Sequence, residues 1–306
     1  MDIEHKVPQL LGQLNTVIVG KAAQIQDCLA CMLAGGHLLI DDVPGVGKTT
    51  LAHALARTLG LQFSRVQFTS DLMPSDLSGV SIYERGREAF VFHPGPIFAQ
   101  VLLADEINRA SPKTQSALLE AMEEKQVSVE GETRALPQPF FVIATQNPQD
   151  QVGTYALPES QLDRFLMRIS LGYPDRAAER ALLSGHDRRA MLDQLPSLLQ
   201  AGELEQLQQR VLQVHAAEPL LDYVQDLIAA TRNGQWFVQG LSPRAGIAVL
   251  RAARAQALIL GRSYVAPDDV QAILPQTIAH RLVPTGDAGR GPVEQVQAML
   301  QAVPLP

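Results

Sequence analysis

The sequence of 306 residues predicts an α/β fold, a doubly wound parallel sheet with helices on both faces, followed by a smaller all-α domain. Short apolar segments alternate with helical patterns in the first half, as in chains that build parallel sheets. Hydrophobic residues make up 46% of the chain and aromatic ones only 5%, so we expect a core of Leu, Val, Ile and Ala. The strand pattern ends at Tyr173-Pro174, and helical patterns with short turns follow.

Five strands and the helices between them account for the α/β part. We expect strands at residues 37–40, 65–68, 101–104, 140–144 and 167–171. Helical patterns cover residues 8–34, with a turn near Val19-Gly20, and residues 49–59 and 113–124. The change of pattern predicts a domain boundary near residue 175, between an α/β domain of residues 1–175 and an all-α domain of residues 176–306.

Charge and cysteine content exclude several classes of protein. The net charge of −7 argues against a globally basic nucleic-acid-binding protein, although not against a local basic channel. Cys28 and Cys31 form a C-x-x-C pattern without the further ligands of a zinc site, so we expect them in the core. We expect neither a signal peptide nor a membrane span, because the required apolar stretches are missing. Low cysteine content favours a reducing compartment, and we expect a cytoplasmic protein.

A phosphate-binding loop follows the first predicted strand. Residues 42–49 read D-V-P-G-V-G-K-T, which matches G-x-x-x-x-G-K-[ST] except that Asp42 replaces the first glycine. In this motif backbone N–H groups surround the phosphates, the lysine reaches the β and γ oxygens, and the hydroxyl binds Mg²⁺. We therefore expect ATP and Mg²⁺ as cofactors. The nucleotide contacts would come from Pro44, Gly45, Val46, Gly47, Lys48, Thr49 and Thr50, with Thr49 also on the metal. A carboxylate repels a triphosphate, so we expect Asp42 to point away from it, toward solvent or a cation.

Two carboxylates end the third predicted strand. Asp105 and Glu106 directly follow an apolar run, at the sheet edge where the phosphate loop is expected. Asp105 is predicted to hold Mg²⁺, directly or through water, and Glu106 to polarise the attacking water. An apolar run that ends in Asp-Glu is common, and it is the phosphate loop upstream that favours this interpretation.

Four segments together resemble the MoxR family of AAA+ ATPases. They read DEINRA at residues 105–110, KTQSALLEAM at 113–122, ATQNP at 144–148 and LDRF at 162–165. The resemblance extends from about residue 7 to about residue 284. It implies an AAA+ P-loop NTPase with Walker A and Walker B motifs and an all-α lid. It also implies that Val19 and Gly20 lie beside the adenine.

The resemblance further implies roles for Asn147 and Arg164. Asn147 matches sensor 1, whose amide orients the attacking water or contacts the γ-phosphate; an asparagine in a turn before Pro148 is the alternative. Arg164 matches the arginine finger, which reaches the γ-phosphate bound by the neighbouring subunit. Arg168 is the second candidate for that role, and the alternative for Arg164 is a surface residue paired with Asp163 or Glu159.

Arg244 and two insertions complete the resemblance. Arg244 matches sensor 2, which connects the lid to the bound phosphate. It follows Ser242-Pro243, a good helix start, and a cation in a first helical turn favours an anion as its partner. Residues 77–97 interrupt the expected second helix of the α/β domain, and residues 126–136 alternate around a Glu-Gly turn, which is typical of a hairpin. Related rings carry such hairpins on the pore face.

Three functional classes remain open. The resemblance implies an ATP-driven chaperone or remodeller, a ring and expected homo-hexamer, which acts on a client complex with a von Willebrand factor A domain partner. A nucleic-acid motor would share both insertions, but glutamates interleave with Arg85, Arg87 and Arg134, where a groove for phosphates needs net positive charge. A nucleotide-gated binding module with low turnover is favoured by Asp42 and opposed by Glu106 and Asn147.

Overall fold

The computed structural model describes residues 3–147, 153–183, 188–286 and 291–306. Its centre is a parallel sheet with the strand order β2-β5-β8-β1-β9. The strands are β1 (His37–Asp41), β2 (Phe63–Gln67), β5 (Val101–Asp105), β8 (Phe141–Gln146) and β9 (Phe165–Ile169). All five predicted strands are present, with bounds that differ by at most two residues, and the α/β fold is confirmed.

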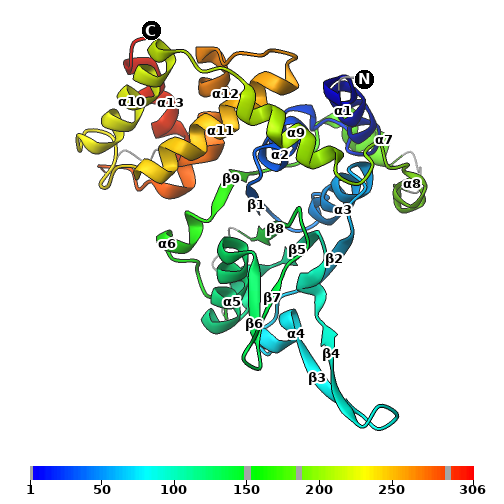
Figure 1. Ribbon diagram of the computed structural model, residues 1–306. Coiled ribbons are helices and arrows are strands. Elements are labelled where there is room, and N and C mark those ends of the chain that lie inside the picture. The colour runs from blue at the N-terminus through cyan, green and yellow to red at the C-terminus, as the bar shows by residue number, and fades with distance from the viewer. Residues whose placement is uncertain (1–2, 148–152, 184–187, 287–290) are drawn as a thin grey trace.

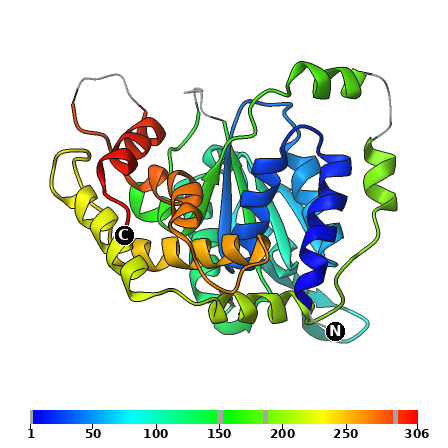
Figure 2. The ribbon, with the colours of Figure 1, turned by 90° about the horizontal axis from the view of Figure 1, so that it is seen from above.

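Side chains of the sheet alternate between two cores, because successive residues of a strand point to opposite faces. Leu38 and Ile40 of β1 join the core that contains α1 (Lys6–Val17), α2 (Ala22–Leu33) and α3 (Lys48–Thr58). Leu39 joins the opposite core with α4 (Pro74–Ser78) and α5 (Pro112–Glu124). Figure 2 shows helices on both sides of the sheet. Cys28 and Cys31 are free thiols buried within α2, as predicted.

The elements after β9 are helices. The larger ones are α7 (Arg176–Leu183), α8 (Arg188–Gln194), α9 (Glu203–Gln213), α10 (Glu218–Arg232), α11 (Pro243–Ile259), α12 (Pro267–Ile278) and α13 (Pro292–Ala302). The short turn η4 (Ala279–Arg281) also follows β9, and the other short helical turns precede it: η1 (Ile3–His5), η2 (Pro96–Phe98), η3 (Ile107–Arg109) and α6 (Glu159–Leu162). Helix α12 packs on β9, and α11 packs on α2 and α9. The division at residue 175 coincides with this change of structure and stays a prediction.

Two hairpins project from the end of the molecule opposite helices α9–α13 (Figure 1). Strand β3 (Gly79–Glu84) pairs with β4 (Ala89–Pro94) inside the insertion at residues 77–97. Strand β6 (Gln126–Val129) pairs with β7 (Glu132–Ala135). The Arg134 guanidinium lies 3.9 Å from the centroid of the Phe92 ring, so the two hairpins contact each other. Across the described ranges, no helix is long and apolar enough to cross a membrane.

Two helices that carry residues of interest begin at serine caps. Ser111 accepts a hydrogen bond from the backbone N–H of Thr114 at the start of α5. Ser242 accepts one of 3.2 Å from the N–H of Ala245 at the start of α11. Each serine is followed by proline, whose fixed φ suits the first helical position. These caps set the register that places Glu123 in the last turn of α5 and Arg244 in the first turn of α11.

Candidate active site

The phosphate loop joins β1 to α3 at the carboxyl edge of the sheet. Gly45 and Gly47 have φ angles of +86° and +96°, a conformation that glycine adopts without steric cost. Helix α3 begins at Lys48, so its first N–H groups and the positive end of its dipole are available to an anion. The local geometry is therefore that of a phosphate-binding loop.

Lys48 links this loop to the neighbouring strand. Its Nζ donates hydrogen bonds to the backbone oxygen of Asp42 at 2.5 Å and to Oδ1 of Asn147 at 3.1 Å. Burial lowers the pKa of Lys48, and the carboxylates of Asp42, Asp105 and Glu106 oppose that shift. Asn147 in turn donates from Nδ2 to Oε1 of Glu106 at 3.3 Å. A continuous chain of polar contacts thus runs from Lys48 through Asn147 to Glu106.

Asp42 points away from the phosphate side of the loop. Its Oδ2 accepts hydrogen bonds of 2.6 Å from the backbone N–H groups of both Leu171 and Gly172, and one of 3.1 Å from Ser170. Its Oδ1 accepts from the N–H of Val43 at 2.8 Å. The prediction that Asp42 faces solvent or a cation was wrong. The carboxylate is buried, and its hydrogen bonds connect the phosphate loop to the segment that follows β9.

The acidic pair is held by side chains of the two adjacent strands, β2 and β8. Thr145 donates to Oδ1 of Asp105 at 2.6 Å and accepts from the backbone N–H of Glu106 at 2.9 Å. Arg65 of β2 binds Oδ2 of Asp105 at 2.6 Å. Gln67, two residues along the same strand, donates to Oε2 of Glu106 at 3.1 Å. Contacts from the neighbouring strands therefore orient both carboxylates.

Glu106 itself has an unusual backbone. Its φ of +56° lies in the left-handed region, which is uncommon for residues other than glycine and recurs at functional sites. Arg109, three residues on, donates to Oε2 of Glu106 at 2.8 Å. The bend turns the chain from β5 into the short turn η3 directly after the carboxylate. The Glu106 side chain thus stands at the end of its strand, within reach of Asn147.

The residues predicted to bind Mg²⁺ suit that ion. A hydroxyl and a carboxylate, from Thr49 and Asp105, are the oxygen donors that Mg²⁺ prefers. Thr49 and Arg65 line one cavity of about 490 Å³, and the Arg65 guanidinium already places positive charge on Asp105. Within the described ranges, no group of three or more His, Cys, Asp or Glu could hold a metal alone. Phosphate oxygens and water would have to complete the coordination.

The segment predicted to flank the adenine lies against the connection between β9 and α7. Gly20 has a φ of +74°, and a Cβ added there would come within 2.9 Å of the Ala178 side chain. Lys21 donates to the backbone oxygen of Tyr173 at 2.8 Å. Val19 is half-buried beside it. These contacts join the turn between α1 and α2 to the start of the helical part.

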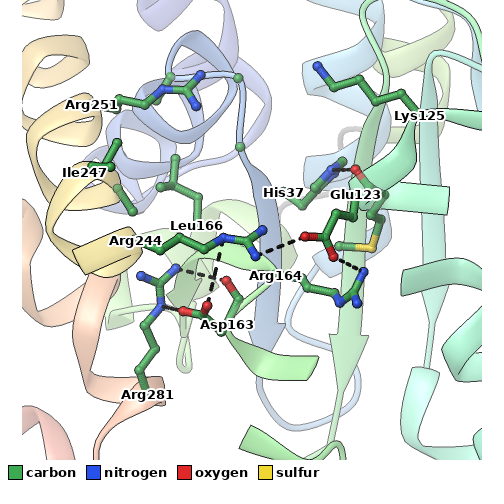
Figure 3. Close-up of a pocket in the computed structure, with 15 residues that line it drawn as sticks. His37, Glu123, Lys125, Asp163, Arg164, Leu166, Arg244, Ile247, Arg251 and Arg281 are labelled. Atoms are coloured by element: carbon green, nitrogen blue, oxygen red, sulfur yellow. Dashed lines mark hydrogen bonds and ion pairs between the residues drawn. The ribbon is translucent and has the colours of Figure 1, made fainter. Parts of the chain in front are cut away.

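A second polar site surrounds Arg164 and Arg244. Both arginines line a cavity of about 300 Å³ between α5, α11 and the start of β9 (Figure 3). Arg164 Nη1 lies 2.6 Å from Oε2 of Glu123 and donates to the backbone oxygen of Leu119 at 2.7 Å. Arg244 Nη1 lies 3.1 Å from Oε1 of the same glutamate. One carboxylate therefore bridges two arginines that are far apart in the sequence.

The Arg244 guanidinium also faces Asp163, at 4.0 Å from its Oδ2, on the side of Arg281. Arg281 Nε lies 3.2 Å from Asp163 Oδ1, and its Nη2 donates to the Phe165 backbone oxygen at 2.9 Å. Burial lowers the pKa of Arg281, and Asp163 opposes that shift. Positive and negative charges thus alternate from η4 across to α5.

The lining of this cavity is positive although the chain is acidic. Burial lowers the pKa of His37 to about 4, so His37 is neutral at pH 7. Five cations and two carboxylates remain, a net charge of +3; they are Lys125, Arg164, Arg244, Arg251 and Arg281, and Glu123 and Asp163. No lining residue belongs to the phosphate loop. The sensor 2 role of Arg244 stays a prediction, and the packing of the lid places this arginine beside Arg164.

Arg168, the second candidate for the arginine finger, lies elsewhere. Its Nη2 contacts Oδ2 of Asp41, and the two residues line a separate cavity of about 160 Å³ with His280. Burial lowers the pKa of His280 to about 3, so this histidine is neutral as well. Arg168 therefore neutralises a buried aspartate at the end of β1.

Several polar residues of the site were missed in the sequence. Arg65 and Gln67 stand at positions i and i+2 of one strand, so both side chains lie on the same face of the sheet. That spacing could have indicated that both contact the neighbouring acidic pair. Thr145 stands two residues before Asn147, which indicates a place in the site less strongly. Glu123 carried no motif, because a glutamate in the last turn of an amphipathic helix is ordinarily a solvated residue.

Comparisons with known proteins agree with this geometry. Residues 37–167 match a family model described as "ATPase family associated with various cellular activities (AAA)", and residues 229–302 match one described as "AAA lid domain". The chain is 41% identical to "Chaperone MoxR1" of Mycobacterium tuberculosis, with 99% of this chain and 83% of the relative covered. It is 46% identical to the uncharacterized protein YeaC of Bacillus subtilis, with 92% and 88% covered.

A solved structure extends the comparison to the whole fold. The crystal structure of a Cytophaga hutchinsonii protein described as a candidate ATPase superposes with a TM-score of 0.91 at 35% identity, covering 99% of this chain and 96% of that one. The fold and the site together define a nucleoside triphosphatase of the AAA+ class with a helical lid. Within that class, the chain belongs to the MoxR family of AAA+ ATPases.

Proposed function

We propose that this chain hydrolyses ATP with Mg²⁺ as a subunit of a homo-hexameric ring, and that the ring uses the reaction to remodel a client protein complex. The contact chain from Lys48 through Asn147 to Glu106 carries the hydrolytic part. It gathers at one sheet edge a cation for the phosphates, an amide that can orient water, and a carboxylate that can take a proton.

Each residue of the site has a role in this proposal. Backbone N–H groups of residues 44–50 would surround the phosphates, and Lys48 would exchange its bond to Asn147 for the β and γ oxygens. Thr49 and Asp105 would hold Mg²⁺, which neutralises phosphate charge when it is bound. Asn147 would orient the attacking water, and Glu106 would accept its proton.

The arginine pocket supports a site that is completed by a second subunit. A net charge of +3 attracts an anion, and no phosphate-loop residue of the same chain lines the cavity. The triphosphate bound by a neighbouring copy is an anion of the right kind. We therefore assign Arg164 and Arg244 to the nucleotide of the next subunit, across a head-to-tail interface that closes into a ring. An arginine supplied in this way contributes about 10³-fold or more to phosphoryl transfer.

A mixing experiment tests the assignment. Arg164→Ala and Glu106→Gln subunits should each have little ATPase activity alone. In a mixed ring, the Arg164→Ala subunit keeps a nucleotide site with an intact Glu106. Its Glu106→Gln neighbour keeps Arg164 and can place that arginine in the site, so one complete site forms between the two. Activity should therefore appear on mixing. Mixtures that stay inactive, while wild-type subunits mixed with either variant form rings, would contradict an arginine acting between subunits.

The client role rests on the family. One relative at 41% identity is named a chaperone, and we propose the same kind of action here, in the cytoplasm, with a von Willebrand factor A domain protein as partner. Nucleic acid is not favoured as the client. Arg87 lies 3.4 Å from Glu84, and Arg134 lies 2.5 Å from Glu132, so carboxylates of the same hairpins neutralise these cations.

A further inference from the structure

The geometry points to Glu123 as a positioning residue that couples Arg164 to Arg244. We infer that Glu123 holds the two arginines as one unit and yields both together to the triphosphate of the neighbouring subunit. The inference rests on the proposed function, because it concerns the arginines assigned there to the neighbour's nucleotide. It adds a residue to which neither the motifs nor the comparisons assign a role.

The placement of Glu123 is specific. Its two oxygens take one arginine each, Oε2 at 2.6 Å from Arg164 and Oε1 at 3.1 Å from Arg244. Glu123 belongs to α5, Arg164 precedes β9, and Arg244 opens α11 of the lid. Figure 3 shows the carboxylate between the two guanidinium groups. Glu123 is therefore the shared counterion of one arginine from the α/β part and one from the lid.

The strength of these contacts suits a replaceable partner. The side chains of Glu123, Arg164 and Arg244 are 36%, 28% and 57% exposed. Ion pairs at such exposure contribute little to the stability of the fold. A triphosphate offers several charged oxygens, and arginine binds such groups through paired, charge-assisted hydrogen bonds. The incoming phosphates would therefore outcompete the single carboxylate.

Each arginine also has an anchor of its own. Arg164 donates to the Leu119 backbone oxygen, and Arg244 faces Asp163. Without the Glu123 charge, each guanidinium would settle on its own anchor, and the two would act independently. With Glu123, a triphosphate that draws one arginine away also repels the shared carboxylate, so the other arginine is released as well. The shared carboxylate thus makes the two arginines cooperative.

The coupling is measurable with a double-mutant cycle on kcat. Arg164→Ala, Arg244→Ala and the double variant are compared in the wild-type and in the Glu123→Gln background. With Glu123 present, the double variant should lose far less than the product of the two single losses, by at least about fivefold. With Glu123→Gln, the two losses should multiply. Glu124→Gln is the matched control, an exposed glutamate next in the chain that should leave the coupling intact.

Glu123→Asp is a second test, because its shorter carboxylate keeps the charge but is too short to bridge both arginines. Its losses should also multiply, whereas a purely structural role for Glu123 would move stability and leave the coupling unchanged. If Arg164→Ala and Arg244→Ala each lower kcat and their losses multiply with Glu123 intact, the inference on Glu123 is overturned. The proposed site between subunits then still stands. Coupling that persists in Glu123→Gln overturns the inference on Glu123 as well. If neither arginine variant lowers kcat, the proposed trans site fails with it.

Discussion

The carboxylate of Asp42 accepts a hydrogen bond of 2.6 Å from the backbone N–H of Gly172. This contact explains how the phosphate loop tolerates an acid where the motif has glycine. The carboxylate satisfies buried backbone donors beyond the end of β9, and its charge faces those donors rather than the phosphates. Asp42 in place of glycine therefore adds hydrogen bonds that stabilise the loop, and it places no negative charge on the nucleotide side.

Asp42→Ala should lower the free energy of unfolding by about 2–3 kcal/mol, because the N–H groups of Leu171 and Gly172 lose their acceptor in a buried site. Urea unfolding measures this. Ser170→Ala, which removes one donor to the same carboxylate, should cost about 1 kcal/mol. Asp42→Gly restores the motif, yet it should bind nucleotide no more tightly than the wild type. A clear gain in affinity would show that the carboxylate acts on the phosphates after all.

Arg65 lies beside Asp105, the carboxylate proposed to hold Mg²⁺. Its Nη2 lies 2.6 Å from Oδ2 of Asp105, so Mg²⁺ bound there as proposed would be repelled by this positive charge. Arg65→Gln should lower the Mg²⁺ concentration for half-maximal nucleotide binding by about fivefold, which corresponds to about 1 kcal/mol. Titration with a fluorescent ATP analogue reports this without turnover.

The control for that titration is Arg85→Gln. Arg85 is an exposed cation in the turn between β3 and β4, so its removal changes the net charge but not the site. It should leave the Mg²⁺ dependence unchanged. A shift of equal size in both variants would mean that the overall charge sets the Mg²⁺ requirement, and Arg65 would have no special part in it.

The contact chain at the sheet edge could be anticipated from the sequence for a simple reason. Lys48, Glu106 and Asn147 each follow a parallel strand or open the helix after one, and the carboxyl ends of parallel strands meet at one edge. Local patterns therefore suffice to gather them. Asp42 escaped the prediction because its partners, such as Gly172, lie after another strand and act through backbone N–H groups that no side-chain pattern reveals.

The position of Arg244 could not be anticipated in the same way. It depends on how the lid packs, and that packing uses contacts between distant segments, such as His280 Nε2 with the Phe165 backbone oxygen and Arg281 with Asp163. A helix start like Ser242-Pro243 tells where α11 begins but not what faces its first turn. The shared glutamate, Glu123, is visible only once α5 and α11 are placed together.

Asp27 predicts a pH dependence of stability. Burial raises the pKa of Asp27 from 3.8 to about 7, although Gln276 of α12 donates to its Oδ2 at 3.3 Å. A raised pKa in the folded state means that the folded protein binds the extra proton between pH 3.8 and pH 7. The contribution of Asp27 to stability is therefore full below pH 3.8 and is lost as the pH rises through 7.

Asp27→Asn imitates the protonated carboxyl, so the variant should unfold about as readily as the wild type near pH 4. At pH 8 it should be more stable by about 2 kcal/mol, roughly half of what a shift of three pKa units implies, because Asp27 is partly exposed. Urea unfolding at both pH values measures the difference. Asp222→Asn, on an exposed carboxylate of α10, should show no such gain; an equal gain in both would remove Asp27 as the cause.

Single-stranded DNA should not stimulate the ATPase. Arg87 is paired with Glu84 and Arg134 with Glu132, so these hairpins lack the positive stripe that follows a phosphate backbone. The measurement is turnover with and without oligonucleotide at low and high salt. Stimulation that falls steeply with added salt would restore the nucleic-acid motor as the leading interpretation.

Glu106→Gln separates turnover from nucleotide gating. The amide keeps the shape of Glu106 and can still bond to Asn147, but it cannot take a proton from water, so phosphate release should fall by about 10²-fold or more while ATP binding remains. Glu124→Gln, the same change at an exposed position, should retain the wild-type rate. If Glu106→Gln released phosphate as fast as the wild type, Glu106 would not be the residue that activates water. That result would favour a nucleotide-gated binding module, whose function needs no hydrolysis. With ATP held in place, the Glu106→Gln ring should also retain its client through purification, and that client should be missing when ADP replaces ATP.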